Sequence, residues 1–282
     1  MMKQQDLEIR PLASAIGAEI LGVDLAEPLG NEGWDQISQA FRDHLVIFFR
    51  DQDLTPDQHI ALARRFGELE PYPFVNGIDG YPELIDIVKM PSEVRNFGAG
   101  WHADMSFREE PPLGAVLHAI EVPPVGGDTM FCNMYLAYET LSDGMKLLVE
   151  TLAGVHDSFE PADHSQNFKG MSLMGKEGAT RQVTRHPLVK THPVTGRKSL
   201  FISPDYCFAI DGMTDRESRM LLDYLEEHAT RHEFCCRFRW QPGSIAVWDN
   251  RCAMHNALND DLAAHAGSKG FKRVMRRATI RR

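Results

Sequence analysis

A His-x-Asp pair is the first feature of this sequence that could bind a metal ion. His102 and Asp104 are separated by one residue, and residues at that spacing point to the same side of a β-strand. The imidazole and the carboxylate would therefore converge on one point. With a second histidine, such a pair forms the 2-His-1-carboxylate triad, which leaves positions on the metal open for O₂ chemistry. The pair alone is a weak signal, because it also occurs by chance.

The second histidine must be one of the 12 in the chain. Histidines in predicted helices, on an apolar strand or directly before a proline are interpreted as structural: His44, His59, His228, His232, His118, His186 and His192. No role is predicted for three others, His156, His164 and His265. His255 follows Trp248-Asp249-Asn250-Arg251 at the end of a strongly apolar strand. We therefore predict His102, Asp104 and His255 as the metal-binding and catalytic residues.

Two arginines near the C-terminus indicate anionic ligands beside this triad. Arg273 and Arg277 are four residues apart, so a strand over residues 273–280 would place both side chains on one face. Burying two guanidinium groups without anions would be costly, and we therefore expect two anionic ligands. Arg273 could bind the distal carboxylate of a dicarboxylate co-substrate through two parallel hydrogen bonds, and Arg277 could bind the substrate.

The elements that must position these residues are mostly β-strands. Apolar or alternating segments predict strands, and the strongest are residues 113–122, 128–133, 234–240, 245–248 and 274–280. Helical spacing or capping residues predict helices at residues 33–44, 55–67, 135–141, 143–152 and 214–228. Many strands with few, peripheral helices predict a mainly β fold, a jelly roll with helical additions. Residues 163–178 are polar and aperiodic, and we interpret them as a mobile loop or lid.

Length and composition limit the class of protein. With 282 residues and 43% hydrophobic content, the chain can form one large core, and we predict a single domain over residues 1–282. A formal net charge of −10 argues against nucleic acid as a partner. No apolar run approaches the roughly 18 residues of a membrane span, so no membrane association is expected. Five cysteines without a C-x-x-C spacing, and an N-terminus without an apolar signal core, favour a reducing cytoplasm.

Several short motifs resemble, in the same order, those of the taurine dioxygenase/TfdA family of Fe(II)- and 2-oxoglutarate-dependent dioxygenases. They are Gly17-Ala18-Glu19-Ile20, Arg65-Phe66-Gly67-Glu68-Leu69, Trp101-His102-Ala103-Asp104, Gly126-Gly127-Asp128-Thr129, Thr191-His192-Pro193-x-x-Gly196, Trp248-Asp249-Asn250-Arg251 and Arg277-Ala278-Thr279-Ile280. The resemblance covers nearly the whole chain. It implies a double-stranded β-helix, a homodimer or homotetramer, and the use of Fe(II), 2-oxoglutarate and O₂. It also implies roles for six residues: iron binding by His102, Asp104 and His255, 2-oxoglutarate binding by Thr129 and Arg273, and substrate binding by Arg277.

The sequence departs from taurine dioxygenases where the family binds substrate. Tyr72 and Val75 replace a histidine and a tyrosine, and Gly98 replaces an asparagine before the His-x-Asp pair. Aromatic or apolar residues would make the pocket larger and less polar: Phe74, Val75, Phe107, Phe159, Tyr206 and Phe208. We therefore expect the substrate pocket to be lined, beside Arg277, by Tyr72, Val75, Gly98, Phe159 and Tyr206. The segment between His255 and Arg273 is longer than in taurine dioxygenases, and residues 259–270 are expected to form a loop near the pocket.

The resemblance implies hydroxylation of a C–H bond in a small anionic organic substrate, with release of succinate and CO₂. The departures favour an aryloxyalkanoate-like acid, another carboxylate, a sulfonate or a sulfate ester over taurine. Three alternatives stay open: taurine dioxygenase proper, a cupin-type metal isomerase or hydrolase, and a non-enzymatic jelly-roll sensor of small molecules. The loss of an iron ligand would favour the sensor, and all three ligands are present.

Overall fold

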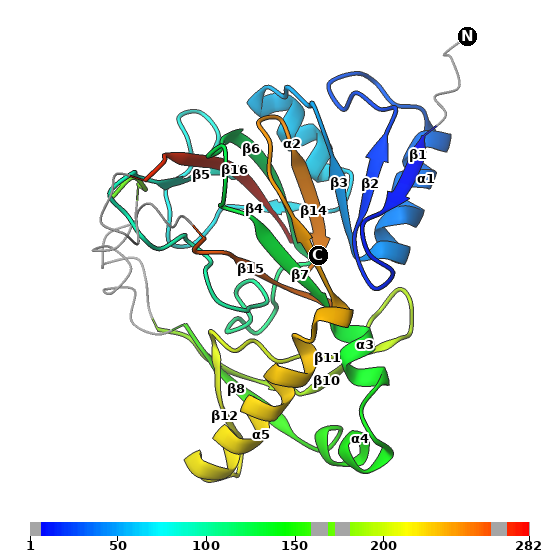
Figure 1. Cartoon of the computed structure of the whole chain (residues 1–282), viewed down its shortest axis with the longest axis vertical. Coiled ribbons are helices and arrows are strands. Elements are labelled where there is room, and N and C mark those ends of the chain that lie inside the picture. Colours follow the sequence, from blue (N-terminus) through cyan, green and yellow to red (C-terminus); the bar gives the residue numbers. More distant parts are fainter. Residues whose placement is uncertain (1–6, 159–168, 173–180, 261–269, 282) are drawn as a thin grey trace.

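Arg273 and Arg277 lie on a strand of the main sheet, the largest sheet in the described part of the chain. The structure is a computed structural model that describes residues 7–158, 169–172, 181–260 and 270–281 (Figure 1). Within these ranges, eight strands form one sheet in the order β1-β2-β3-β14-β6-β16-β4, with β5 also paired to β16. Their bounds are β1 Glu8–Pro11, β2 Ala18–Leu21, β3 Val46–Phe49, β14 Ile245–Asp249, β6 Gly114–Glu121, β16 Arg273–Ile280, β4 Leu69–Glu70 and β5 Leu84–Lys89.

Both faces of this sheet are buried at its centre. Val46 and Phe48 of β3 face one side, where they pack with Trp248 of β14. Ile47 and Phe49 face the other side and pack in a separate cluster. A strand that is buried on both faces needs apolar residues throughout rather than polar alternation. The uninterrupted apolar run of β3 meets this requirement, and all four of its residues are buried.

A smaller sheet faces the main sheet across the core. It has the order β13-β7-β15, with β13 Cys235–Phe238, β7 Thr129–Asn133 and β15 Ala253–Ala257. The ring of Phe238 stacks on Phe48 with 3.9 Å between centroids, and the ring of Phe131 lies 6.0 Å from Trp248. An aromatic core thus joins two facing sheets, which is the arrangement that a jelly roll requires.

Two helices cover the outer face of the main sheet (Figure 1): α1 Asn31–His44 and α2 Pro56–Arg64. Ile37 and Phe41 of α1 are buried in the cluster on that face. The start of α2 is the predicted capping box, in which the Thr55 side chain accepts from the backbone N–H of Gln58 and the Gln58 side chain accepts from that of Thr55. The helix ends at Arg64, slightly before the predicted end at Gly67.

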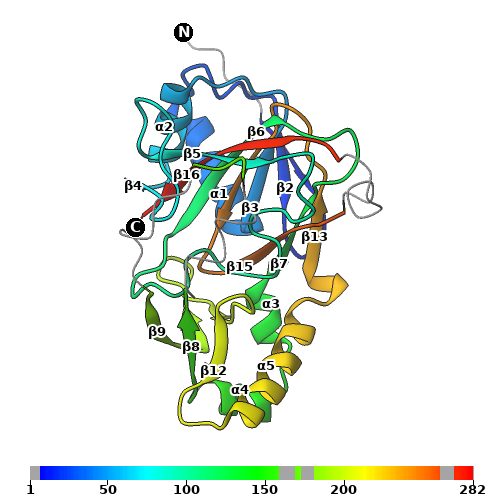
Figure 2. The same cartoon turned by 90° about the vertical axis from the view of Figure 1, so that its left-hand side faces the viewer.

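The opposite end of the molecule is a mixed layer of short strands and helices (Figures 1 and 2). Its elements are β12 Cys207–Ile210, β8 Ala153–Asp157 and β9 Val183–Pro187 in one sheet, the pair β10 Val189–Thr191 and β11 Lys198–Leu200, and the helices α3 Met134–Glu139, α4 Asp143–Val149, α5 Asp215–Ala229 and η3 His232–Phe234. The N-cap residues Ser142 of α4 and Thr214 of α5 both accept backbone hydrogen bonds through their side chains. Among the described residues, no helix is long and apolar enough to cross a membrane.

The strand expected around the His-x-Asp pair is not formed. His102 makes an isolated bridge to His255, and Asp104 lies in a turn that continues into Met105 with a φ of 45°. The expectation of a continuous strand is therefore wrong. The bridge and the turn nevertheless direct both side chains to one point, as described below.

Acid should destabilise this fold through a buried histidine of α2. His59 is buried, and burial together with His118 lowers its pKa to about 3. Because an unfolded histidine has a pKa of about 6.5, the unfolded chain binds more protons between these two values, and the stability contributed by His59 is lost as the pH falls below about 6.5. We expect the urea midpoint to decrease from about pH 7.5 to about pH 5, and to decrease less in His59→Gln. An equal decrease in both proteins would contradict this role.

Candidate metal centre and anion-binding pocket

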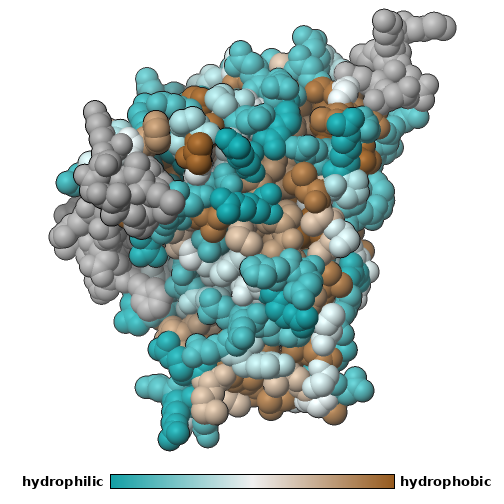
Figure 3. Space-filling model, viewed as in Figure 1, coloured by the Kyte–Doolittle hydropathy of each residue, from teal (hydrophilic) through white to brown (hydrophobic). Residues whose placement is uncertain are grey.

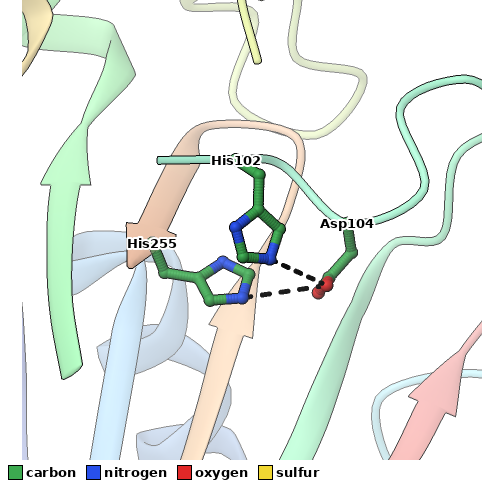
Figure 4. Close-up of side chains that lie close together, drawn as sticks. All are labelled: His102, Asp104 and His255. Atoms are coloured by element: carbon green, nitrogen blue, oxygen red, sulfur yellow. Dashed lines mark ion pairs between the residues drawn. The ribbon is translucent and has the colours of Figure 1, made fainter. Parts of the chain in front are cut away.

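Two histidines and an aspartate from distant parts of the chain meet in the core. His102 N donates to His255 O (3.0 Å), and His255 N donates to His102 O (2.9 Å). The Nε2 atoms of both rings lie 3.7 Å from Oδ1 of Asp104 (Figure 4). All three side chains are buried, and their possible ligand atoms lie within 4.8 Å of one another. The structure thus brings together the three residues predicted from the sequence.

The carboxylate of Asp104 is held through its other oxygen. Oδ2 accepts a hydrogen bond from Nε1 of Trp248 (3.1 Å) and lies 2.9 Å from Nη2 of Arg277. Burial alone would raise the pKa of this carboxyl, but the charge of Arg277 and the two histidines lower it to about 2. The carboxylate is therefore ionised, and its Oδ1 faces the two imidazoles.

The backbone carbonyl of Gly100 orients the ring of His102 through a hydrogen bond. Nδ1 of His102 lies 2.9 Å from Gly100 O, which can only accept, so Nδ1 carries the proton and Nε2 offers a lone pair. Gly100 has a φ of 110°, and a Cβ at this position would lie 2.6 Å from Cγ of Asp205. This conformation and this space both require glycine. Nothing in the sequence distinguishes Gly100 from the other glycines, so its importance was missed.

Aromatic packing orients the ring of His255. The ring centroid lies 4.8 Å from that of Trp248 and 5.9 Å from that of Phe131. Its Nδ1 is buried and has no hydrogen-bond partner among the described residues. Burial and the neighbouring His102 lower the pKa of His255 to about 3. The imidazole is therefore neutral at physiological pH, which is the form that binds a metal ion.

A second group of potential ligands is already used by the fold. His192, Asp249 and Cys252 are buried, with ligand atoms within 4.8 Å. Nδ1 of His192 accepts hydrogen bonds from two backbone N–H groups of the following turn (3.1 and 3.2 Å), and its Nε2 lies 3.1 Å from Asp249 Oδ2. Asp249 also accepts two side-chain hydrogen bonds from Arg251. Both ring nitrogens of His192 are therefore engaged, which agrees with its interpretation as a structural histidine.

Arg273 is a buried cation with an unused donor. It is 4% exposed, and its Nε has no hydrogen-bond partner among the described residues. Burial lowers its pKa to about 10, although Asp260 and Asp128 act in the opposite direction. The side chain of Arg273 lies close to Gly127. A Cβ added to this glycine would lie 3.3 Å from Cδ of Arg273. Such a buried guanidinium is costly unless an anion binds it.

The hydroxyl of Thr129 is oriented by a tryptophan. Nε1 of Trp240 can only donate, and it donates to Oγ1 of Thr129 at 2.9 Å. The hydroxyl hydrogen is therefore available for another acceptor. Thr129 pairs with Ala257, two residues beyond His255 on β15, so Thr129 and His255 face the same side of the smaller sheet. Trp240 was predicted only as a buried strand residue, and its contact with Thr129 was missed.

Arg277 and a row of aromatic rings form a wall beside Asp104. Arg277 is buried, and its guanidinium carbon lies 5.3 Å from the ring centroid of Tyr72. Burial raises the pKa of Tyr72 to about 12, so its hydroxyl stays protonated and can donate. Val75 is buried in the same cluster. Ring contacts connect Tyr72 to the metal centre through successive pairs: Tyr72–Phe74, Phe74–Phe107, Phe107–Tyr206 and Tyr206–His102.

Gly98 leaves space next to His102. A Cβ on Gly98 would lie 3.3 Å from Cε1 and 3.6 Å from Nε2 of that ring. Phe208, in contrast, does not belong to this wall: it is 48% exposed and lines a separate cavity between β12 and α5, so its expected place in the pocket is wrong. Phe159 lies outside the described residues, as do residues 163–168 and 173–178 of the expected lid and 261–269 of the expected loop.

Comparison with known proteins identifies the family. A model of the Taurine catabolism dioxygenase TauD, TfdA family matches residues 8–279. The chain belongs to this family. Similar proteins include an alkylsulfatase of Acinetobacter baylyi, 32% identical over 98% of this chain and 85% of its own length. The alpha-ketoglutarate-dependent 2,4-dichlorophenoxyacetate dioxygenase of Cupriavidus pinatubonensis is 35% identical over 95% of this chain and 96% of its own length.

A solved structure of the TauD/TfdA family confirms the fold. The crystal structure of a taurine dioxygenase from Burkholderia xenovorans has a TM-score of 0.81 and 38% sequence identity, and the match covers 97% of this chain and 90% of that chain. The predicted jelly roll is therefore confirmed. The chain is a dioxygenase, and its family uses Fe(II), 2-oxoglutarate and O₂. This membership favours an enzyme over the sensor, and a dioxygenase over a cupin-type isomerase or hydrolase.

Proposed function

We propose that this protein hydroxylates a C–H bond of a small anionic substrate with a largely apolar body, such as an aryloxyalkanoate or a sulfate ester. The observation that carries the proposal is the buried set of His102, Asp104 and His255, whose ligand atoms the fold has already gathered. The buried arginines beside this set supply a second line of support, because each can receive one anion. The co-substrate leaves as succinate and CO₂.

His102, Asp104 and His255 would hold the Fe(II) ion. Two neutral imidazoles and one carboxylate match the ligand set that suits non-haem Fe(II) and leaves positions open. Bound there, Fe(II) with 2-oxoglutarate and O₂ supplies the oxidation. The protein orients the ligands, since Gly100 holds the ring of His102 and Trp248 holds the carboxylate of Asp104. Such supporting groups strongly influence the affinity of a metal site.

Arg273 and Thr129 would bind the distal carboxylate of 2-oxoglutarate. The fit rests on two unused donors, the buried Nε of Arg273 and the hydroxyl of Thr129, whose oxygen already accepts from Trp240. A guanidinium can donate two parallel hydrogen bonds to a carboxylate. Burial of Arg273 strengthens this attraction, because the surrounding protein screens charge less than water does.

Arg277 would bind the anionic group of the substrate, and the aromatic wall would contact its apolar body. The Tyr72 hydroxyl offers another donor beside Arg277. Taurine carries an ammonium group, and neither Val75 nor Gly98 offers a polar side chain for it. The alkylsulfatase and the 2,4-dichlorophenoxyacetate dioxygenase are named for anionic compounds with apolar groups, which supports the same class of substrate here.

An anaerobic binding experiment tests the iron and co-substrate sites without knowledge of the substrate. Addition of Fe(II) and 2-oxoglutarate to the protein should produce a weak visible charge-transfer band. His102→Ala should abolish this band, whereas the control His232→Ala should retain it, because His232 is exposed and does not belong to the three gathered ligand residues. A band that survives in His102→Ala would contradict the proposed metal site.

A substrate panel tests the remaining part of the proposal. Succinate release that depends on O₂ should rise above the uncoupled rate with aryloxyalkanoates or alkyl sulfates, and should rise less with taurine. Arg277→Met should remove this increase while 2-oxoglutarate still produces the band. If taurine gives the highest rate, the protein is a taurine dioxygenase proper and the proposed substrate class is wrong.

A further inference from the structure

Two carboxylates lie beside the buried guanidinium of Arg273 without pairing with it. Asp128 directly follows Gly127, whose added Cβ would lie 3.3 Å from Cδ and 3.4 Å from Nε of Arg273. Asp260 contacts the same glycine, since its Oδ1 accepts a hydrogen bond from the backbone N–H of Gly127 at 2.5 Å. Among the described residues, the ion pairs of both carboxylates are made with Arg237 and not with Arg273.

Arg237 binds both carboxylates from the surface of the protein. It lies on β13, an outer strand of the smaller sheet (Figure 2), and its side chain is 55% exposed. Nε of Arg237 donates to Oδ2 of Asp128 at 2.7 Å, and Nη2 donates to Oδ2 of Asp260 at 2.8 Å. One exposed guanidinium is thus paired with two acidic groups that neighbour a buried one.

Asp128 and Arg273 each retain one buried polar atom without a partner. Oδ1 of Asp128 and Nε of Arg273 both lack a hydrogen-bond partner among the described residues. A carboxylate and a guanidinium that are buried close together attract each other strongly. Burial lowers the pKa of Arg273 to about 10, and the charges of Asp260 and Asp128 act against this effect. The two carboxylates are therefore competitors of any anion that approaches Arg273.

We propose that Arg237 is a positioning residue for 2-oxoglutarate: by binding Asp128 and Asp260, it keeps the guanidinium of Arg273 available to the distal carboxylate. This inference rests on the proposed role of Arg273 in binding the co-substrate. Arg237 acts through Arg273 and makes no contact with the co-substrate itself. Without Arg237, both carboxylates lose the cation that binds them, and Arg273 is the buried cation beside them.

The partners of Arg237 distinguish it from an ordinary surface arginine. Hydrophilic residues cover much of the face seen in Figure 3, and exposed ion pairs contribute little to stability. Asp128, in contrast, is 6% exposed, and the next residue in the chain is Thr129, which is also proposed to bind 2-oxoglutarate. Loss of Arg237 would therefore leave a buried carboxylate uncompensated beside the co-substrate site.

Anaerobic titration of the charge-transfer band with 2-oxoglutarate measures this effect on the full chain. Arg237→Met should weaken 2-oxoglutarate binding by about tenfold or more, because a carboxylate of the protein then occupies the guanidinium that the co-substrate needs. Arg237→Lys keeps the charge and should retain part of the affinity. The affinity for 2-oxobutanoate, a 2-oxo acid without the distal carboxylate, should not change, and neither should the affinity for Fe(II).

Removal of the competing charges should restore the binding of 2-oxoglutarate. In the triple variant Arg237→Met/Asp128→Asn/Asp260→Asn, each asparagine keeps an acceptor oxygen while the negative charge is lost. The affinity for 2-oxoglutarate should return to the wild-type value or above it. A residue that only supported the fold would not give this result, because the triple variant restores none of the lost ion pairs.

The matched control is Arg239→Met, two residues further along the chain. Arg239 is also exposed, but its Nη2 donates to a backbone carbonyl, that of Pro124, at 2.7 Å. Its replacement leaves no carboxylate without a partner, so 2-oxoglutarate should bind to this variant as it binds to the wild type.

The inference is overturned if Arg237→Met binds 2-oxoglutarate like the wild type, or if the triple variant binds it as weakly as Arg237→Met. It is also overturned if the affinity of Arg237→Met for 2-oxobutanoate decreases by the same factor. Arg273→Met in the same titration separates this inference from the proposed function. If Arg273→Met weakens binding and Arg237→Met does not, only the positioning role is wrong. If Arg273→Met binds 2-oxoglutarate like the wild type, the proposed co-substrate site is wrong and the positioning role with it.

Discussion

Gly100→Ala should weaken the binding of Fe(II) by about 10- to 100-fold, which is the usual effect of disturbing a group that orients a metal-binding histidine. The backbone at Gly100 has a φ of 110°, which costs a residue with a side chain about 1–3 kcal/mol. The added Cβ would also collide with the carboxylate of Asp205. Relief of this strain moves the carbonyl that accepts from Nδ1 of His102, and Nε2 then turns away from Asp104. Anaerobic competition with a chelating dye measures the affinity.

Gly80→Ala is the matched control for this change. Gly80 also has a positive φ, 78°, but a Cβ there would have no atom within 4 Å. We expect it to lower the thermal midpoint while leaving Fe(II) affinity unchanged. Adding Asp205→Gly to Gly100→Ala should recover part of the affinity, because it removes the collision and leaves the backbone strain. Wild-type Fe(II) affinity in Gly100→Ala would show that this carbonyl does not position His102.

Arg273→Met should weaken 2-oxoglutarate binding and stabilise the protein without co-substrate, two effects of opposite sign. Removing one partner of a buried charge pair costs about 2–5 kcal/mol, which is on the order of a 30-fold loss of affinity or more. Without 2-oxoglutarate, however, the guanidinium is buried with its Nε unpaired. Replacing a buried charged group by an apolar side chain of similar volume is often stabilising, by about 1–4 kcal/mol. Titration of the charge-transfer band and thermal unfolding measure the two effects separately.

Two variants on the same strand show whether the charge or its geometry matters. Arg273→Lys keeps the charge but loses the two parallel donors, so its affinity for 2-oxoglutarate should lie between those of the wild type and Arg273→Met. Arg276→Met removes a partly buried ion pair with Asp86, and we expect it to leave the affinity unchanged. Arg273→Met with wild-type affinity for 2-oxoglutarate would contradict the proposed role of Arg273.

The parts of the site that depend on the two-residue alternation of side chains along a β-strand could be predicted from the sequence. β16 extends over Arg273–Ile280, and Met275, between the two arginines, is buried in the core between the sheets. The even spacing of Arg273 and Arg277 was therefore sufficient to predict that both are directed inward. The continuous apolar run of β14 likewise predicted a strand, which the structure shows to be buried along its whole length, and His255 lies on β15, directly after that strand and its turn.

The supporting groups could not be predicted, because they depend on which segments are neighbours in space. Trp240 reaches Thr129 only because β13 pairs with β7, and no local pattern specifies that pairing. A glycine is needed at position 100 because Asp205, which is distant in the sequence, fills the space that a side chain would occupy. Phe208 was misplaced for a related reason: it lies on a short strand whose outer face meets α5, and its apolar character alone indicated burial.

The reciprocal backbone hydrogen bonds between His102 and His255 hold the two imidazoles in place before any ion arrives. Asp104 is held by Trp248 and Arg277, so the three side chains proposed to bind the metal are fixed relative to one another. For ligands of this kind, affinity generally increases from Mn²⁺ through Fe²⁺ and Co²⁺ to Ni²⁺ and Cu²⁺. If His102, Asp104 and His255 bind the metal as proposed, Fe(II) competes poorly with the later ions of this series on affinity alone. The relative abundance of free metal ions around the protein would then contribute to the fraction of molecules that hold Fe(II) and can turn over.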